Sequence, residues 1–196
     1  MRLLISTICL VILNACEQKN SIQPDAVIKQ ANTTISKEDA IEQPPAPILF
    51  APGIASINTG PTTVAELLAF ARSLIGTPYR YASTDPSVGF DCSGFITYVF
   101  NHFHIAVPRS SVDFTNIEKE IKLADAKPGD LILFTGTDST IRVVGHMGIM
   151  ISKENDEHYF IHSTSGKANG VTISTLSKYY LSRFVKVIRI FPENDH

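Results

Sequence analysis

A cysteine stands where a glycine-containing turn passes into an apolar helical pattern, in the segment Phe90–Phe95 (FDCSGF). The pattern predicts a helix that begins at Cys92, with Asp91 as its N-cap. Unpaired backbone N–H groups and the positive end of the helix dipole would favour the thiolate of Cys92, which is its nucleophilic form. At this point a reactive cysteine and a buried structural cysteine are both open readings. The apolar positions recur every three to four residues, as on a buried helix face: Phe95, Ile96, Val99, Phe100 and Phe103.

The first 15 residues have the features of an export signal. Arg2 precedes the apolar run Leu3–Leu13, which is too short to span a bilayer. The run ends in Leu-Asn-Ala-Cys, which resembles a bacterial lipoprotein signal cleaved before Cys16; an ordinary secretory signal is the alternative. We expect residues 1–15 to be a signal peptide and Cys16 to carry lipid that holds the protein at a membrane. Glu17 favours the outer membrane of a Gram-negative cell, with the protein facing the periplasm.

The cysteine count gives Cys92 added weight. Of the three cysteines, Cys9 leaves with the signal and Cys16 carries lipid, so Cys92 is left as a free thiol outside the cytoplasm. Residues 16–60 are rich in proline and polar residues and are predicted to be a flexible linker, followed by one domain at 61–196. A net charge of −2 gives no sign of nucleic-acid binding.

Two helical patterns precede a series of strand patterns. Thr63 and Glu66 have capping-box spacing before an apolar stripe, so a helix is expected from Val64. A short helix is expected after Ser110 or Ser111. Helices first and strands afterwards predict an α+β fold, in which the cysteine helix packs on a mostly antiparallel sheet. The predicted strands are residues 131–134, 142–152, 158–163, 171–174 and 184–190.

Two histidines, His146 and His162, fall on neighbouring predicted strands. Lys153–Asp156 resembles the turn of an antiparallel hairpin, and a turn centred on residue 154 would place the histidines directly opposite each other. Opposed side chains have Cβ atoms about 5 Å apart. With Cys92, they would form a nucleophile, a base and a group that orients the base. Metal binding is a weaker reading because no third clustered ligand is evident.

These segments together resemble the NlpC-type cell-wall endopeptidases, which are papain-like cysteine peptidases. The resemblance covers about residues 64–190 and depends on five motifs in order: residues 71–79 (ARSLIGTPY), 91–95 (DCSGF), 107–110 (VPRS), 128–131 (PGDL), and 146–149 (HMGI) followed by 161–163 (IHS). Two departures are evident. Ala82-Ser83 replaces a Gly-Gly pair that is common in the family, and residues 135–143 and 165–170 form longer loops, which would alter substrate range.

The resemblance implies a role for each motif residue. It makes Cys92 the nucleophile, His146 the general base and His162 the residue that orients His146. Tyr79 would help to stabilise the oxyanion, and Ser93 would line the cleft. Arg109 is a candidate to bind a substrate carboxylate. The implied substrate is a peptidoglycan stem peptide cut between D-γ-glutamyl and a diamino acid, by a monomer with neither cofactor nor metal. The alternatives are a catalytically silent wall-binding lipoprotein and an amide or acyl transferase on the same core.

Overall fold

The computed structural model describes residues 56–117 and 119–196. The predicted signal peptide 1–15, Cys16 and most of the predicted linker 16–60 lie outside these ranges. Within them, the side chains of Ile57 and Thr59 are already buried. No helix in the described ranges is long and apolar enough to cross a membrane.

Two helices form from the patterns that predicted them. Helix α1 (Val64–Ser73) begins at Thr63, whose side chain and backbone exchange hydrogen bonds with Glu66 in a capping box. Helix α2 (Cys92–His102) begins after Asp91, as expected. The short helix expected near Ser111 is the 3₁₀ helix η1 (Ser111–Asn116).

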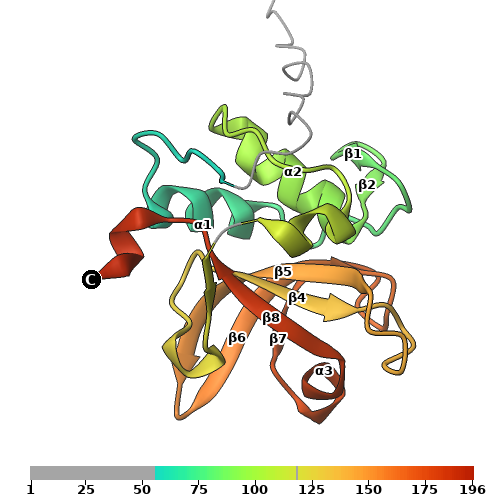
Figure 1. Cartoon of the computed structure of the whole chain (residues 1–196). Coiled ribbons are helices and arrows are strands. Elements are labelled where there is room, and N and C mark those ends of the chain that lie inside the picture. The colour runs from blue at the N-terminus through green and yellow to red at the C-terminus, as the bar shows by residue number, and fades with distance from the viewer. Residues whose placement is uncertain (1–55, 118) are drawn as a thin grey trace, which may run out of the picture. The chain divides into compact units, whose positions relative to one another are not determined.

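A six-stranded antiparallel sheet forms the other layer, in the order β3-β8-β4-β5-β6-β7. Helices α1 and α2 cover one face, and α3 lies at the other (Figure 1). This arrangement confirms the predicted α+β fold. The sheet and the remaining elements are β3 (Lys119–Ile121), η2 (Leu123–Asp125), β4 (Leu131–Thr135), β5 (Val144–Glu154), β6 (Glu157–Thr164), β7 (Gly170–Thr175), α3 (Lys178–Arg183), β8 (Phe184–Arg189) and η3 (Pro192–Asp195).

Hydrophobic residues pack on both faces of the sheet. The larger core lies between the sheet and helices α1 and α2, and a second core on the opposite face includes Ile132, Phe134 and Phe160. Strand β4 contributes to both cores, and all five of its residues are buried. Its sequence is therefore a continuous apolar run rather than an alternating one.

Some elements differ from the prediction. Between Tyr79 and Asp91, where no strand was predicted, lie the two-residue strands β1 (Thr84–Asp85) and β2 (Gly89–Phe90), which pair with each other. Strand β3 and helix α3 were not predicted, because three and six residues are too few to display a period.

The segment that leads to Tyr79 runs along strand β7. The Gly76 N–H donates to Val171 O (2.9 Å), and the Val171 N–H donates to Thr77 O (2.8 Å). The Tyr79 N–H donates to Asn169 O at 3.0 Å. Backbone contacts with the edge of the sheet therefore fix the position of Tyr79.

Candidate active site

Cys92 occupies the first residue of α2. Asp91 has an extended backbone, and its carboxylate accepts a hydrogen bond from the Gly94 N–H at 2.5 Å. A Cβ at residue 94 would lie 2.0 Å from Ser83 O, so only glycine allows this close approach. The sequence Asp-Cys-Ser-Gly thus starts the helix and presses its first turn against the preceding loop.

The preceding loop contains the residues that depart from the family pattern. Ala82 adopts a left-handed backbone with φ of 59°, a conformation that costs an L-residue about 1–2 kcal/mol. This is where a glycine would be unstrained. The turn is nevertheless formed, because Ser83 O accepts a hydrogen bond from the Asp91 N–H at 3.2 Å.

Asp91, Ser93 and Arg109 form a polar cluster beside the nucleophile. Arg109 donates from both Nη atoms to the two Asp91 carboxylate oxygens, at 3.1 and 2.8 Å, and to Ser93 Oγ at 2.9 Å. Ser93 is buried, whereas the Arg109 side chain is 43% exposed. These contacts give Arg109 a structural partner, and its contact with substrate stays a prediction.

The two histidines contact each other on the sheet. His146 lies on β5 and His162 on β6, with 2.8 Å between His146 Nε2 and His162 Nδ1. The predicted proximity is confirmed, but direct opposition is wrong. Ile149 pairs with Ile161, so the same register places Gly148 opposite His162.

The register differs for two local reasons. The hairpin turns at Asn155-Asp156, both with positive φ, rather than around residue 154, and the register shifts between Met150 and Ser152. A Cβ on Gly148 would lie 3.1 Å from His162 Cβ and 2.7 Å from the Phe160 ring. The absence of a side chain at Gly148 lets the histidines meet diagonally.

Ser174 on β7 extends the histidine pair. Its Oγ lies 2.9 Å from His162 Nε2, so both ring nitrogens of the fully buried His162 have partners. If the free nitrogen of His146, Nδ1, is to accept a proton, then His146 Nε2 must carry hydrogen and donate to His162. His162 must in turn donate to Ser174. Ser174 was not among the predicted site residues, since nothing distinguishes it from other strand serines.

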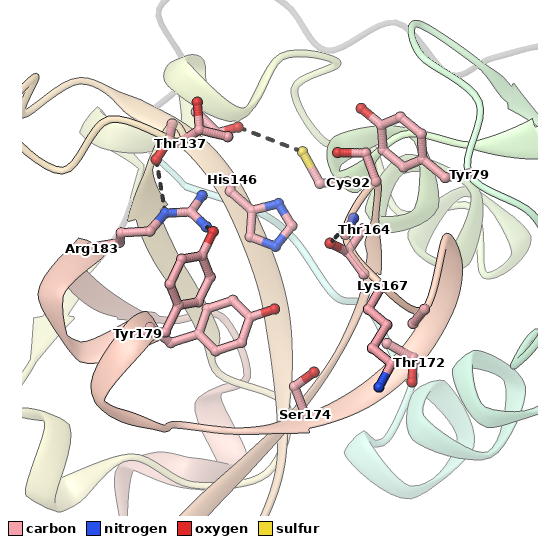
Figure 2. Close-up of a pocket in the computed structure, with 16 residues that line it drawn as sticks. Tyr79, Cys92, Thr137, His146, Thr164, Lys167, Thr172, Ser174, Tyr179 and Arg183 are labelled. Atoms are coloured by element: carbon pink, nitrogen blue, oxygen red, sulfur yellow. Dashed lines mark hydrogen bonds between the residues drawn. The ribbon is translucent and has the colours of Figure 1, made fainter.

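The Cys92 sulfur lies over the part of β5 that contains His146. It donates a long hydrogen bond of 3.9 Å to Gly145 O, the carbonyl of the residue before His146. Cys92, His146 and Tyr79 line one pocket of about 990 Å³ (Figure 2). His162 contacts His146 but is not among the lining residues, and Ser93 and Arg109 lie in the Asp91 cluster instead.

The described geometry favours uncharged side chains at the site. Burial, with a smaller contribution from Asp91, raises the pKa of the Cys92 thiol to about 11, although nearby backbone N–H groups oppose the rise. Burial, then the proximity of His162 and Arg183, lowers the pKa of His146 well below its usual value. Burial, then Arg183, lowers the pKa of His162 to about 3. The lowered thiol pKa expected from the helix N-terminus is therefore wrong for this state, since desolvation outweighs the helix dipole.

Alkylation can measure the charge state of Cys92. With a pKa near 11, about 10⁻⁴ of the thiol is ionised at pH 7, and each pH unit up to about 10 raises the ionised fraction tenfold. We expect the rate of iodoacetamide labelling of the Cys92 peptide, followed by mass spectrometry, to rise over this whole range. The labelling rate of glutathione in the same sample should become constant near pH 9. A labelling rate that is already constant at pH 7 would indicate a preformed thiolate–imidazolium pair.

Tyr79 lines the pocket with Cys92, and Ser163 connects the two layers of the site. Burial, then the proximity of Cys92, raises the pKa of Tyr79, so its hydroxyl stays a hydrogen-bond donor at neutral pH. Ser163, next to His162, donates from its buried hydroxyl to Phe90 O at 2.7 Å. This bond ties the histidine strand to the segment just before Cys92.

Further residues around the pocket were not among the predicted site residues, although Lys167 lies in the predicted loop 165–170. Tyr179, Tyr180 and Arg183 are on α3, and Lys167 is in the loop between β6 and β7. The Tyr180 ring centroid lies 5.6 Å from that of His162. In the described ranges, no group of three or more His, Cys, Asp or Glu side chains is arranged to hold a metal ion.

A comparison with known protein families identifies the family to which this site belongs. The family model described as the NlpC/P60 family matches residues 76–189, which contain all the site residues above. The chain belongs to the NlpC/P60 family. The resemblance inferred from the five motifs is thereby confirmed.

Individual relatives support the same assignment. A protein named gamma-DL-glutamyl hydrolase from Bacillus subtilis is 32% identical over 136 residues, which cover 69% of this chain and 32% of the relative. A probable endopeptidase NlpC homolog from Haemophilus influenzae is 34% identical over 56% of this chain and 52% of the relative. The chain thus spans between a third and a half of the length of these relatives.

Solved structures agree in fold. An NlpC/P60 family protein from Bacillus cereus superposes with a TM-score of 0.60 at 26% identity, over 69% of this chain and 42% of that one. The peptidoglycan hydrolase RipB from Mycobacterium tuberculosis gives a TM-score of 0.51 at 27% identity, over 65% and 64%. The papain-like arrangement of helices on an antiparallel sheet is shared with both.

Proposed function

We propose that this protein is a cysteine endopeptidase that hydrolyses amide bonds in peptidoglycan stem peptides through a thioester. The observation that supports this most is the convergence of the Cys92 helix start and the hydrogen-bonded His146–His162 pair at one pocket. The names of the relatives, endopeptidases and peptidoglycan hydrolases, support the substrate class.

Because the Cys92 thiol and the His146 imidazole are both uncharged at rest, the first step includes a proton transfer between them. As the Cys92 sulfur attacks the carbonyl carbon, its proton passes to His146 Nδ1, and the C=O electrons move onto the oxygen. Backbone N–H groups near Cys92 and the Tyr79 hydroxyl would stabilise this oxyanion. The C–N bond then breaks, and His146 returns the proton to the leaving amine. Water, activated by His146, hydrolyses the thioester and restores the thiol.

His162 and Ser174 act on this chemistry through His146. His162 accepts the Nε2 proton of His146 in a hydrogen bond, which leaves Nδ1 free as the base. Ser174 Oγ can accept the Nε2 proton of His162, which supports the tautomer of His162 whose Nδ1 accepts from His146. The order of roles is supported by the hydrogen-bonded series His146, His162 and Ser174, and by the pocket that Cys92 and His146 both line.

Ser174→Ala should lower kcat about three- to tenfold with little change in KM, because one neutral hydrogen bond contributes about 0.5–1.5 kcal/mol. Ser174→Thr, which keeps a hydroxyl, should recover most of the loss. Ser177→Ala is the matched control, since this exposed serine begins α3 without a side-chain capping bond. Steady-state kinetics on a defined stem peptide, with Tm for each variant, would measure these effects. Full kcat in Ser174→Ala would exclude the positioning role.

The bond cleaved is proposed to be that between D-γ-glutamyl and the diamino acid. Purified cell wall digested with the protein should release fragments with a new diamino-acid N-terminus, identified by mass spectrometry. Products joined to an added amine would instead indicate a transferase. Wall binding without any product would indicate a catalytically silent wall-binding protein.

Cell-envelope location accords with relatives named as a probable peptidoglycan endopeptidase and a peptidoglycan hydrolase. We propose in addition that Cys16 is lipidated and holds the protein at the outer membrane, facing the periplasm. This rests on the Leu-Asn-Ala-Cys sequence and on Glu17 alone. Several acyl chains together would give durable anchoring, as each buried CH₂ contributes about 0.8 kcal/mol.

A further inference from the structure

The pocket beside Cys92 carries positive charge without negative charge. Among its lining residues, Lys167 and Arg183 are the permanently charged ones, and no aspartate or glutamate is among them. The other polar groups are hydroxyls and backbone, including Thr164, Thr172 and Ser174. A cavity with this lining favours an anionic group over a neutral or cationic one.

Arg183 is buried without a carboxylate partner in the described ranges. Its side chain is 6% exposed, and it donates to Gly136 O (2.8 Å), Thr135 O (2.9 Å) and Tyr179 Oη (2.7 Å). A guanidinium has five N–H groups, so these three bonds leave two. Because a buried charge without a counter-ion is costly, an anion in the adjoining pocket would be stabilised.

Lys167 approaches the same space from the loop between β6 and β7. Its side chain is exposed and has no ion pair within the described residues. It extends past Thr164 toward Thr172 on one side of the pocket, and Arg183 and Tyr179 lie on the opposite side (Figure 2). The two cations therefore flank the space next to His146.

We propose that the Lys167–Arg183 pocket binds a carboxylate that the substrate carries beside the scissile amide. Since Cys92 and His146 line the same cavity, the carboxylate belongs to one of the two residues that the amide joins. Lys167 supplies a mobile point charge, and Arg183 with the Tyr179 hydroxyl supplies fixed donors. Lys167 lies in one of the two loops expected to alter substrate range. The proposal rests on the proposed peptidase function and specifies its substrate.

Three synthetic stem peptides test the pocket. One has free carboxylates on both sides of the scissile amide, one is amidated on the acyl-side glutamyl residue, and one is amidated on the amine-side residue. We expect one of the two amidated peptides to have a kcat/KM about ten- to a hundredfold below that of the peptide with both carboxylates, because a hydrogen bond to a charged group contributes about 1.5–3 kcal/mol. The sensitive position identifies which residue supplies the carboxylate. Lys167→Gln should reduce this preference at least about fivefold, whereas Lys122→Gln, an exposed lysine away from the pocket, should preserve it.

Binding measurements distinguish a failure of the carboxylate-pocket proposal from a failure of the peptidase proposal. Calorimetry with the Cys92→Ala protein should show the same carboxylate preference and its reduction by Lys167→Gln, whether or not the wild type cleaves any peptide. Lack of cleavage with retained preference would overturn the peptidase proposal and support the pocket. Equal binding of all three peptides, or an unchanged preference in Lys167→Gln, would overturn the pocket proposal.

Discussion

Cys92→Ala should abolish hydrolysis of stem peptides, with kcat/KM reduced at least about a thousandfold, because it removes the group that forms the thioester. Cys92→Ser should be nearly as inactive, since a hydroxyl is far less ionised and less nucleophilic than a thiol. Both variants should fold, because one atom at a partly exposed helix start contributes little to the free energy of unfolding. Digestion of purified wall, with a thermal melt for each variant, measures both expectations.

Cys16→Ser is the matched control for this experiment. It replaces a cysteine that lies outside the described residues, and its kcat/KM on a soluble stem peptide should equal that of the wild type. Turnover retained by folded Cys92→Ala would exclude the cysteine-peptidase mechanism, whatever the control shows.

The second large effect separates the two histidines. His146→Ala should be nearly as inactive as Cys92→Ala, because His146 is the imidazole that lines the pocket with the thiol. His162→Asn and His162→Gln should keep measurable activity, reduced about 10–100-fold, because an amide can still orient His146. The double variant should be scarcely worse than His146→Ala, since residues that act as one unit are not additive. Measurements of kcat/KM on one defined peptide give this order.

His158→Gln is a suitable control for the loss of a strand histidine. His158 is also buried on β6, but its Nδ1 has no hydrogen-bond partner, and it does not line the pocket. The activity of the His158→Gln variant should match that of the wild type. If folded His162→Asn were as inactive as His146→Ala, or if His146→Ala stayed active, the assigned roles would be wrong.

Elements with a long period or a clear cap could be predicted from the sequence. The capping box at Thr63 and the N-cap at Asp91 gave the starts of both long helices, because these signals are local. Strand β5 was placed near its observed bounds but began at Val144 rather than Arg142, since the exposed residues before it continue the loop. Helix α3 escaped prediction because its burial depends on packing against the sheet, and a six-residue segment carries little pattern of its own.

The site was predictable where motif residues are few and chemically distinctive. Cys92, His146 and His162 are such residues, and the structure brings the two histidines into contact. The diagonal histidine register depended on a bulge, and the raised pKa of Cys92 depended on burial; neither can be read from spacing. Ser174 was missed because its relevance arises from a tertiary contact.

The backbone of Gly76–Tyr79 also determines how the sheet meets other molecules. Exposed edge strands offer unpaired N–H and C=O groups to a foreign strand, which is a common route to aggregation. By bonding to Val171, this segment covers the start of the β7 edge, while the opposite edge is the three-residue, charged strand β3. Substitutions that detach Gly76–Tyr79 would therefore do more than displace Tyr79. They would also expose the start of β7 as a template for edge-to-edge association at high protein concentration.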